Sequence, residues 1–387
     1  MSRLGDIFDL VGGGTPTTSK EEYWGSGTPW ISSADIDNSG QIVYRRRVTP
    51  LGVENSTTNV VPKGTVIVVT RVGLGKVAQL KEDTCFSQDI QALLAKENTS
   101  EYSPSYLMYQ LLFIMQTVKY SGRGTTISGI TKKQLADVSL FLPPLPEQER
   151  IVAQIEELFS QLDAGVETLK KTKAQLAVYR QAVLKEAFSD CKNHVTIASI
   201  TQHVTDGDHM PPPKADNGVP FIMISNIKGN AICWENTAFV DRNYYESIDS
   251  KRKPQIGDVL YTVTGSYGIP VLVDFDKEFC FQRHIALLRP KDTIEQKYLY
   301  YALMEPGVFA QATKGATGTA QKTVGLGVLR KIEIPIIHDR SEQMRKVENI
   351  ESKLSVCDSI EQTVDAALQQ AEALRQSILK DAFEGRL

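Results

Sequence analysis

The sequence repeats itself once, with an offset that drifts only from 191 to 195 residues. "TPWISSADI" (28–36) returns as "VPFIMISNI" (219–227), and "YRQAVLKEAFSD" (179–190) returns as "LRQSILKDAFEG" (374–385). Seven such matches occur in the same order in both halves. A repeat of this length indicates a tandem duplication, in which each half is a globular domain followed by a long helix. The predicted segments are a first domain (1–146), a central helix (147–190), a second domain (191–341) and a C-terminal helix (342–387).

The similarity between the two halves is uneven. The last twelve residues of the two helices are nearly the same, whereas the globular parts share mainly their apolar positions. Two similar helices are expected to do one mechanical task. Two domains with a common scaffold and different polar residues are expected to recognise different things.

Length and composition limit the class of protein. A chain of 387 residues suits two or more domains, and 41% hydrophobic with 23% charged residues is typical of a soluble globular protein. No apolar run reaches the roughly 18–20 residues of a membrane span, and the first residues lack the layout of a signal peptide. The five cysteines are scattered and form no CxxC pair. We therefore expect a reduced, cytoplasmic location and no membrane partner.

The net charge of −3 does not by itself indicate a nucleic-acid binder. Divided by segment, the charge is +1 for 1–146, −1 for 147–192, zero for 193–341 and −3 for 342–387. The acidic excess lies in the helical segments, and each large domain is balanced. A balanced domain can still present one basic face, so composition leaves DNA binding open.

The stretch "PPLPEQER" (143–150) marks the passage from a strand to a helix. Proline is excluded from helix interiors and keeps the residue before it extended, so the three prolines end the strand "VSLFL". Glu147 and Glu149 then fall in the first helical turn, where carboxylates interact favourably with the helix dipole. We interpret the motif as structural and assign no catalytic role to either glutamate.

The segment that follows is predicted to be one long helix to about residue 187, roughly 60 Å in length. Its apolar residues recur every seven positions, as they do in the second copy, which indicates a coiled-coil seam. The seam residues are Ile155, Leu162, Leu169, Leu176 and Val183 in the first helix and Ile350, Cys357, Val364, Ala371 and Ile378 in the second. Packing of each helix on its own domain is the alternative.

Connectivity favours an antiparallel pair of helices. The second domain receives the chain near Ser189 and returns it at Glu342. Antiparallel helices let the chain enter and leave that domain at one end, whereas parallel helices require a bridge along the full helix. We therefore expect an intramolecular antiparallel coiled coil with pseudo-twofold symmetry, and one globular domain at each end.

Each globular domain is predicted to be mixed α/β with a sheet at its core, which makes the chain an α+β protein. Helices are expected at about 104–120 and 295–313. The expected strands are β-branched or apolar runs. They are 65–71, 76–80 and 90–95 in the first domain, and 259–264, 271–275 and 285–289 in the second.

Polar, glycine-rich loops separate these strands. They carry Arg, Lys, Gln, Ser, Thr and His, residue types that donate to phosphates and read base edges. Any single loop of this kind is also compatible with an ordinary surface turn. The candidate DNA contacts are Arg71, Lys76, Arg123, Thr125 and Thr126 in the first domain, and His209, Lys214, Ser266, Tyr267, Lys314, Gln321 and Lys322 in the second.

Enzyme signatures are missing from the sequence. "RVGLGK" (71–76) does not match a P-loop, and no HExxH, CxxC or GxSxG motif occurs. "DGDH" (206–209) reads better as an Asp-Gly turn than as a metal site, and His284 as a packed or DNA-facing side chain. We expect no catalytic residue, no metal and no cofactor in this chain.

The sequence resembles a known family over almost its whole length. "LPPLPEQERIVAQIEELFSQLD" with its weaker copy, "LKEAF" and "LKDAF" at the helix ends, and "GTTISGI" resemble the DNA-specificity subunit of type I restriction–modification systems. The second copy, "RSEQMR" (340–345), lacks the prolines of the first.

The resemblance implies a division of labour among subunits. Each globular half would be a target recognition domain that reads one part of a bipartite, asymmetric duplex DNA site. The paired helices would space the two parts and dock two modification (methyltransferase) subunits. S-adenosylmethionine, ATP and Mg would belong to those subunits and to the restriction (translocase/endonuclease) subunits.

Two other classes of function remain open from the residues alone. One is an enzyme fused to recognition domains, which predicts activity from the isolated chain. The other is a non-catalytic scaffold whose two domains bind ligands other than DNA. Salt-sensitive binding to duplex DNA would separate the DNA-binding subunit from this scaffold, because phosphate contacts weaken steeply as salt rises.

Overall fold

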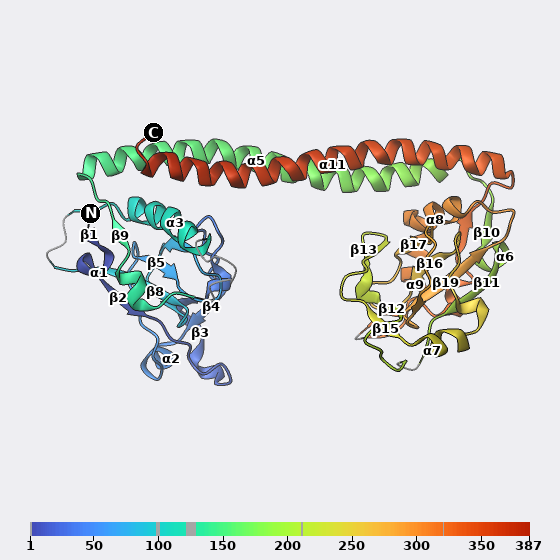
Figure 1. The fold of residues 1–387 in the computed structure, drawn as a ribbon, viewed down its shortest axis with the longest axis horizontal. Helices are drawn as coiled ribbons and strands as arrows, with labels where there is room; N and C mark the ends of the chain where they lie inside the picture. Colours follow the sequence, from blue (N-terminus) through green and yellow to red (C-terminus); the bar gives the residue numbers. More distant parts are fainter. Residues whose placement is uncertain (1, 98–100, 121–128, 210–211, 320) are drawn as a thin grey trace. The chain divides into compact units, whose positions relative to one another are not determined.

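A computed structural model of the chain describes residues 2–97, 101–120, 129–209, 212–319 and 321–387 (Figure 1). The chain packs as two compact units. Unit 1 comprises Met1–Leu169 with Ala366–Leu387, and unit 2 comprises Lys170–Asp365. Each unit therefore contains one globular domain and one segment from each of the two long helices.

Unit 1 is built on two small sheets and a two-stranded ribbon. The antiparallel sheet has the order β2 (Phe8–Gly12), β8 (Ile90–Ala95), β5 (Val66–Val69), β6 (Val77–Gln79). The mixed sheet has the order β4 (Arg46–Val48), β3 (Trp24–Ile31), β7 (Cys85–Phe86), and β1 (Ser2–Arg3) pairs with β9 (Ser139–Leu140). The α-helices are α1 (Leu4–Ile7), α2 (Pro50–Glu54), α3 (Pro104–Tyr120) and α4 (Lys132–Ala136).

Unit 2 repeats this topology strand for strand. Its antiparallel sheet is β11 (Thr201–Asp206), β19 (Ile285–Pro290), β16 (Val259–Thr262), β17 (Pro270–Leu272). Its mixed sheet is β15 (Ala238–Val240), β12 (Val219–Ile222), β18 (Cys280–Phe281), and β10 (His194–Thr196) pairs with β20 (Glu333–Pro335). A hairpin of β13 (Ile227–Lys228) and β14 (Ala231–Ile232) is added. The α-helices are α6 (Ile197–Ile200), α7 (Arg242–Ser247), α8 (Gln296–Met304), α9 (Pro306–Gly315) and α10 (Leu326–Leu329).

The strand registers of the two units also agree. In the parallel pairs, Trp30 lies opposite Cys85 and Phe221 lies opposite Cys280. Because a shift of one residue would turn every side chain to the other face of the sheet, equal registers mean equivalent core positions. The internal repeat predicted from the sequence is thus confirmed, and it gives residue-by-residue equivalences between the units.

Two predicted helices differ from the structure. The central helix, expected from Glu147, is α5 (Leu145–Phe188) and includes Pro146 in its first turn, where proline is tolerated. The single helix expected at 295–313 is two helices, α8 and α9, that meet at Glu305 and Pro306. Proline cannot continue a helix but suits the first position of a new one. The carboxylate of Glu305 caps that new helix by accepting from the backbone N–H of Val308 at 2.9 Å. The helix expected at 104–120 is present as α3.

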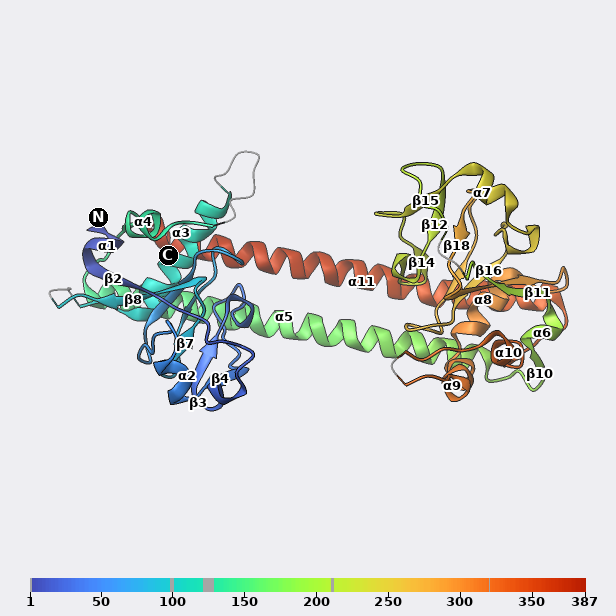
Figure 2. The same ribbon diagram turned by 90° about the horizontal axis from the view of Figure 1, so that it is seen from below.

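The two long helices are α5 (Leu145–Phe188) and α11 (Arg340–Phe383), and they pair in an antiparallel manner within each unit (Figure 2). In unit 1, Arg150 donates to the backbone oxygen of Leu387 at 3.3 Å, and Asp163 forms an ion pair with Arg375. As the residue number rises along α5, the partner's number on α11 falls. This is the direction that connectivity predicted.

The same direction is seen in unit 2. Lys173 binds Asp365 at 2.6 Å, and Arg180 binds Asp358 and Glu361 at 2.5 and 2.9 Å. The predicted seam lies between the helices. Its buried members are Ile155, Leu176, Val183, Ile350, Cys357, Val364, Ala371 and Ile378, and its half-buried members are Leu162 and Leu169.

The outer parts of the long helices also belong to the cores of the globular domains. In unit 1, Ile155 of α5 and Ile378 of α11 pack in one cluster with Tyr106 of α3 and Val66 of the sheet. In unit 2, Phe188 and Ile350 join Tyr298 of α8 in the same way. Helix pairing and packing on the globular domain therefore coexist, with α3 or α8 between the sheet and the helix pair (Figure 1).

A buried glutamine explains why "EQ" follows the prolines in both copies. Gln148 is 0% exposed, accepts from the backbone N–H of Ser103 at 2.9 Å and donates to the oxygen of Pro143 at 2.7 Å. Gln343 in unit 2 accepts from the N–H of Glu295 and donates to the oxygen of Ile337, both at 2.7 Å. Each glutamine joins the start of a long helix to the start of the helix beneath it.

None of the helices in the described ranges has both the length and the apolar character that crossing a membrane would require.

Candidate nucleic-acid interface

Five predicted contact residues of unit 2 come together at the end of β16. The backbone N–H of Gly265, which directly precedes Ser266, donates to the oxygen of Lys322 at 2.9 Å. Gly265 has φ +73, and a Cβ there would lie 2.9 Å from the amide nitrogen of Gln321, so glycine permits this close approach. We call the group Ser266, Tyr267, Lys314, Gln321 and Lys322 the tip cluster.

An aromatic pair supports the tip cluster. The ring of Tyr267 stacks on Phe309 with centroids 5.8 Å apart and an interplanar angle of 15°. The Tyr267 hydroxyl lies 3.3 Å from the hydroxyl of Thr313, the residue before Lys314. Ser266, Lys314, Gln321 and Lys322 are exposed, so their donors face solvent. The stacked rings hold the loop in place without using those donors.

In unit 1 the equivalent place carries Arg71, which is exposed after β5. The backbone N–H of Ile130 donates to the oxygen of Thr70 at 2.8 Å, just as the N–H of Val324 donates to Val263 in unit 2. Arg123, Thr125 and Thr126 lie outside the described residues, so their prediction stays a prediction. Lys76 is half-buried, and its ammonium group donates to the backbone oxygen of Ser33 at 2.9 Å, so it makes a hydrogen bond within unit 1.

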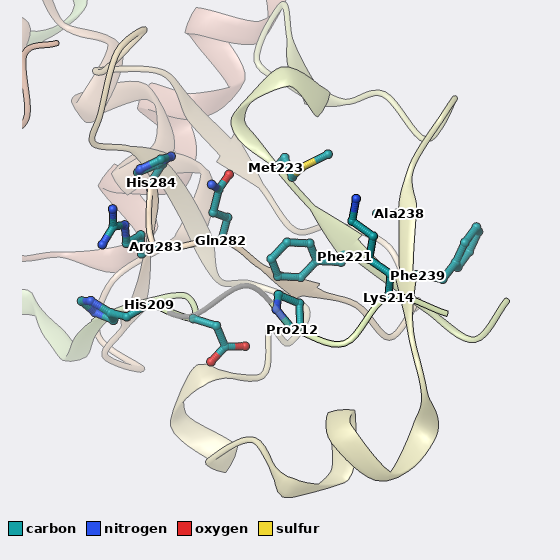
Figure 3. Close-up of a pocket in the computed structure, with 11 residues that line it drawn as sticks. His209, Pro212, Lys214, Phe221, Met223, Ala238, Phe239, Gln282, Arg283 and His284 are labelled. Carbon is teal, nitrogen blue, oxygen red and sulfur yellow. The ribbon is translucent and has the colours of Figure 1, made fainter. Parts of the chain in front are cut away.

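The other two candidates of unit 2, His209 and Lys214, line a separate cavity of about 340 Å³ (Figure 3). Its wall is apolar and includes Phe221 and Met223. Its remaining lining residues are Asp208, Pro212, Ala238, Phe239, Gln282, Arg283 and His284. An apolar wall with polar and cationic groups around it is the usual construction of a binding pocket.

Ion pairs and hydrogen bonds hold the loop that carries His209. Asp208 accepts from the Tyr244 hydroxyl at 2.6 Å and lies 3.3 Å from the guanidinium of Arg252. The ring of His209 lies 2.9 Å from the carboxylate of Asp206. Burial raises the pKa of Tyr244 and the bond to Asp208 raises it further, so this hydroxyl stays a donor.

A second histidine of the cavity is expected to be neutral near pH 7. Burial lowers the pKa of His284, and the adjacent Arg283 lowers it further. A neutral imidazole offers one donor and one acceptor, whereas a protonated one offers two donors. His284 is therefore suited to hydrogen bonding at the cavity rim rather than to contact with a phosphate.

Unit 1 carries a tryptophan at the position of Phe221. Trp30, the counterpart of Phe221, is buried and its indole Nε1 donates to the backbone oxygen of Gly14 at 3.0 Å. Gly14 is the counterpart of Asp208, because both backbone N–H groups donate to the equivalent strand, at Phe86 and Phe281. At the position of Phe221 in the cavity wall, unit 1 therefore has a larger ring whose N–H is held by the backbone.

The prediction from sequence missed one charged surface in unit 1. Arg45, Arg46 and Arg47 are exposed and line a groove of about 580 Å³ together with Trp24. Their signal in the sequence is a run of three arginines, but the run lies at a strand and not in a glycine-rich loop.

The described residues contain no group of three or more His, Cys, Asp or Glu able to hold a metal ion.

Comparison with known proteins identifies the family. The family model described as the type I restriction modification DNA specificity domain matches residues 1–177 and 207–370. The MjaIX specificity subunit of Methanocaldococcus jannaschii is 27% identical over 194 residues, which cover 49% of this chain and 44% of that protein. The EcoBI specificity subunit of Escherichia coli is 24% identical over 325 residues, 74% of this chain and 66% of that protein. The chain thus spans less than two thirds of the length of either relative.

Solved structures show the same fold. A chain from a study of complex assembly and conformational transition of the type I R-M system superimposes with a TM-score of 0.72 at 21% identity, covering 100% of this chain and 97% of that chain. The HsdS subunit from Thermoanaerobacter tengcongensis gives a TM-score of 0.50 at 21% identity, covering 100% and 96%. With the family model matching most of both halves, the chain belongs to the type I restriction modification DNA specificity family.

Proposed function

We propose that this chain is the sequence-specific DNA-binding subunit of a type I restriction–modification complex. Unit 1 and unit 2 each read one part of a bipartite, asymmetric duplex target. The observation that carries the proposal is that equal scaffolds carry unequal surfaces. The same strand order and register present Arg46 and Arg47 in unit 1 but Ala238 and Phe239 in unit 2. Two such surfaces suit two different sequences.

The chemistry of the exposed residues supports duplex DNA as the ligand. Lysine and arginine neutralise phosphates, and Gln, Ser and Arg pair with base edges in the major groove. The tip cluster offers Ser266, Lys314, Gln321 and Lys322, and unit 1 offers Arg71 and the three arginines 45–47. We assign these residues to DNA contact, together with His209, Lys214 and Tyr267, which the sequence also indicates.

The proposal gives this chain no catalytic step. Methyl transfer, with S-adenosylmethionine, belongs to two modification subunits, and cleavage driven by ATP with Mg belongs to restriction subunits. The paired helices α5 and α11 are proposed as the spacer between the two reading units and as the docking surface for those subunits. Exposed apolar side chains on the helix pair of unit 2, such as Val178 and Val356, are consistent with docking.

A domain exchange tests the proposal. The chain is expressed with its modification subunit, residues 1–140 are replaced by those of a relative with another target, and methylated sites are mapped by sequencing genomic DNA. We expect one part of the target to change and the other to stay. The reciprocal exchange of residues 191–341 should change the other part. A simultaneous change of both parts, or duplex binding that salt does not weaken, would contradict it.

A further inference from the structure

The edge strands β4 and β15 occupy equivalent places in the mixed sheets of the two units. Thr28, Pro29 and Trp30 pair with Val48, Arg47 and Arg46, whereas Val219, Pro220 and Phe221 pair with Val240, Phe239 and Ala238. The apolar positions Val48 and Val240 are conserved between the units, but two arginines in unit 1 stand where unit 2 has alanine and phenylalanine. The two surfaces share one backbone and differ in chemistry.

Arg46 lies on a fixed aromatic platform. Its guanidinium carbon is 5.9 Å from the ring centroid of Trp24, within the range of a cation–π contact. Trp24 is held by an edge-on contact with Trp30, 5.2 Å between centroids, and by its indole N–H, which donates to the oxygen of Thr17 at 3.2 Å. A guanidinium held over an aromatic ring loses less freedom when it forms a planar, two-pronged hydrogen bond.

The neighbouring arginines are partly neutralised, and Arg46 is not. Arg45 lies 3.5 Å from Asp35, and Arg47 lies 3.4 Å from Glu82 and donates to the oxygen of Gly27 at 3.0 Å. Among the described residues Arg46 forms no ion pair, and its side chain is exposed. Its hydrogen-bond donors are therefore available to a ligand.

The groove around Arg46 favours an acceptor-rich partner. It is lined by Thr18, Glu21, Trp24, Gly25 and the three arginines. Arg45 and Arg47 have acidic neighbours, so Arg46 contributes the positive charge without an ion-pair partner among the described residues. Planar acceptor pairs on a duplex are the O6 and N7 of guanine in the major groove, which a bidentate arginine reads specifically. Flanking phosphates are the natural partners of the other two arginines.

We infer that Arg46, held on Trp24, determines specificity for a guanine in the part of the target that unit 1 reads. The inference rests on the proposed function and goes beyond it by assigning a base to a residue. Unit 2 has no such arginine at this position, because Ala238 and Phe221 stand where unit 1 has Arg46 and Trp30. The two parts of the target are therefore read by different chemistry at equivalent positions.

The experiment compares Arg46→Lys and Arg46→Ala in the full chain, co-expressed with its modification subunit. Lysine keeps the charge but loses the two-pronged donor. Arg3→Ala is the matched control, because Arg3 is also exposed in unit 1, with 68% of its side chain accessible, and lies on the ribbon β1 rather than on β4. Circular dichroism and thermal unfolding confirm that each variant is folded. Methylated sites are mapped genome-wide, and binding is measured on duplexes with each base at each position.

We expect both Arg46 variants to lose discrimination at one guanine of the unit 1 part, by roughly 5- to 150-fold. The unit 2 part should stay unchanged, and Arg3→Ala should change neither part. The domain exchange identifies which part belongs to unit 1. The inference would be overturned if the unit 1 part contained no guanine or if the target stayed unchanged in the variants. It would also be overturned if Arg46→Lys lost affinity equally for all DNA sequences. Absence of sequence-specific binding by the unaltered chain would instead refute the proposed function.

Discussion

At the residue scale, the most informative side chains are the paired glutamines Gln148 and Gln343. Both are 0% exposed. Gln148 joins the oxygen of Pro143 to the N-terminus of α3, and Gln343 joins the oxygen of Ile337 to the N-terminus of α8. The first helical N–H groups and the loop oxygens have no partner within a helix, so a buried amide that satisfies one of each is strongly favoured. Of the glutamates directly before them, Glu147 is half-buried and Glu342 is exposed.

Replacing Gln148 with leucine should destabilise unit 1. The change leaves the N–H of Ser103 and the oxygen of Pro143 buried without partners, and we expect the free energy of unfolding to fall by about 2–4 kcal/mol. Denaturant unfolding followed by circular dichroism measures this. Gln161→Leu, at an exposed position of the same helix, is the control and should change stability by no more than about 0.5 kcal/mol. Equal effects of both changes would refute the structural role of Gln148.

A second prediction at this scale concerns the equivalent cysteines Cys85 and Cys280. Burial raises the pKa of Cys85 to about 11 and that of Cys280 to about 12. A raised pKa keeps a thiol neutral and unreactive below that pH. In the native chain, half-buried Cys233 should react with a maleimide first, while Cys85 and Cys280 stay protected between about pH 7 and about pH 9. All three should react in denaturant, and fast native labelling of Cys85 would contradict the buried core.

At the element scale, the long helices are held by a seam and by charges beside it. The seven-residue step places apolar residues between α5 and α11, and the ion pairs of Arg180 with Asp358 and Glu361 lie along its edge. Partly exposed ion pairs contribute little stability on their own. They favour the native register to the extent that a slip of the helices would separate the observed pairs. Apolar burial stabilises the pair, and the charges select its alignment.

Two valines on α11 separate the contribution of the seam from that of the helix itself. Val364 is 4% exposed and Val356 is 57% exposed, and both lie in unit 2. Val364→Ala should lower the free energy of unfolding by about 1–3 kcal/mol, because it removes two buried methyl groups and leaves a cavity. Val356→Ala should change it by no more than about 0.5 kcal/mol. The two variants are compared by denaturant unfolding, and similar losses would argue against a seam at Val364.

At the scale of the whole molecule, the chain is a duplication in which the core of each copy includes residues from the long helix of the other copy. Unit 1 contains the last segment of the chain, and Ile378, Leu379 and Ala382 of that segment lie in its core. Unit 2 is completed in the same way by the end of α5, through Leu184 and Phe188. Each globular domain therefore depends on both long helices, which ties the folding of one half of the sequence to the other.

Lengthening both helices by seven residues, after Leu169 and before Ala366, tests the proposed spacer. The insertions keep the seam in phase and add about 10 Å to each helix at 1.5 Å per residue. On B-DNA that is about three base pairs at 3.4 Å each, so the gap between the two parts of the target should grow by about three base pairs. Site mapping by sequencing measures the gap. An insertion in α5 alone should abolish methylation, and an unchanged gap after the double insertion would refute the spacer.

Much of the architecture could be predicted because it rests on local patterns and on chain order. The repeat gave the two domains, and the seven-residue step gave the seam that Val183 and Val364 occupy. The entry and exit of the second domain gave the helix direction, seen in the pairing of Asp163 with Arg375. The family resemblance was likewise carried by contiguous motifs. The break at Pro306 was missed, although it follows from a residue whose effect is local and could have been predicted.

By itself, then, the sequence determined the duplication, the helices and their direction, because periodicity and connectivity are properties of the chain. Only the tertiary structure decided which side chains meet. Arg46 reaches Trp24, and Gly265 reaches Lys322, because sheet register joins positions that are far apart in sequence. The same register places Phe221 in the wall of a cavity in unit 2 and ties its counterpart Trp30 to the backbone of Gly14 in unit 1. Contacts of this kind depend on the exact volume and direction of packed side chains, which no pattern along the chain records.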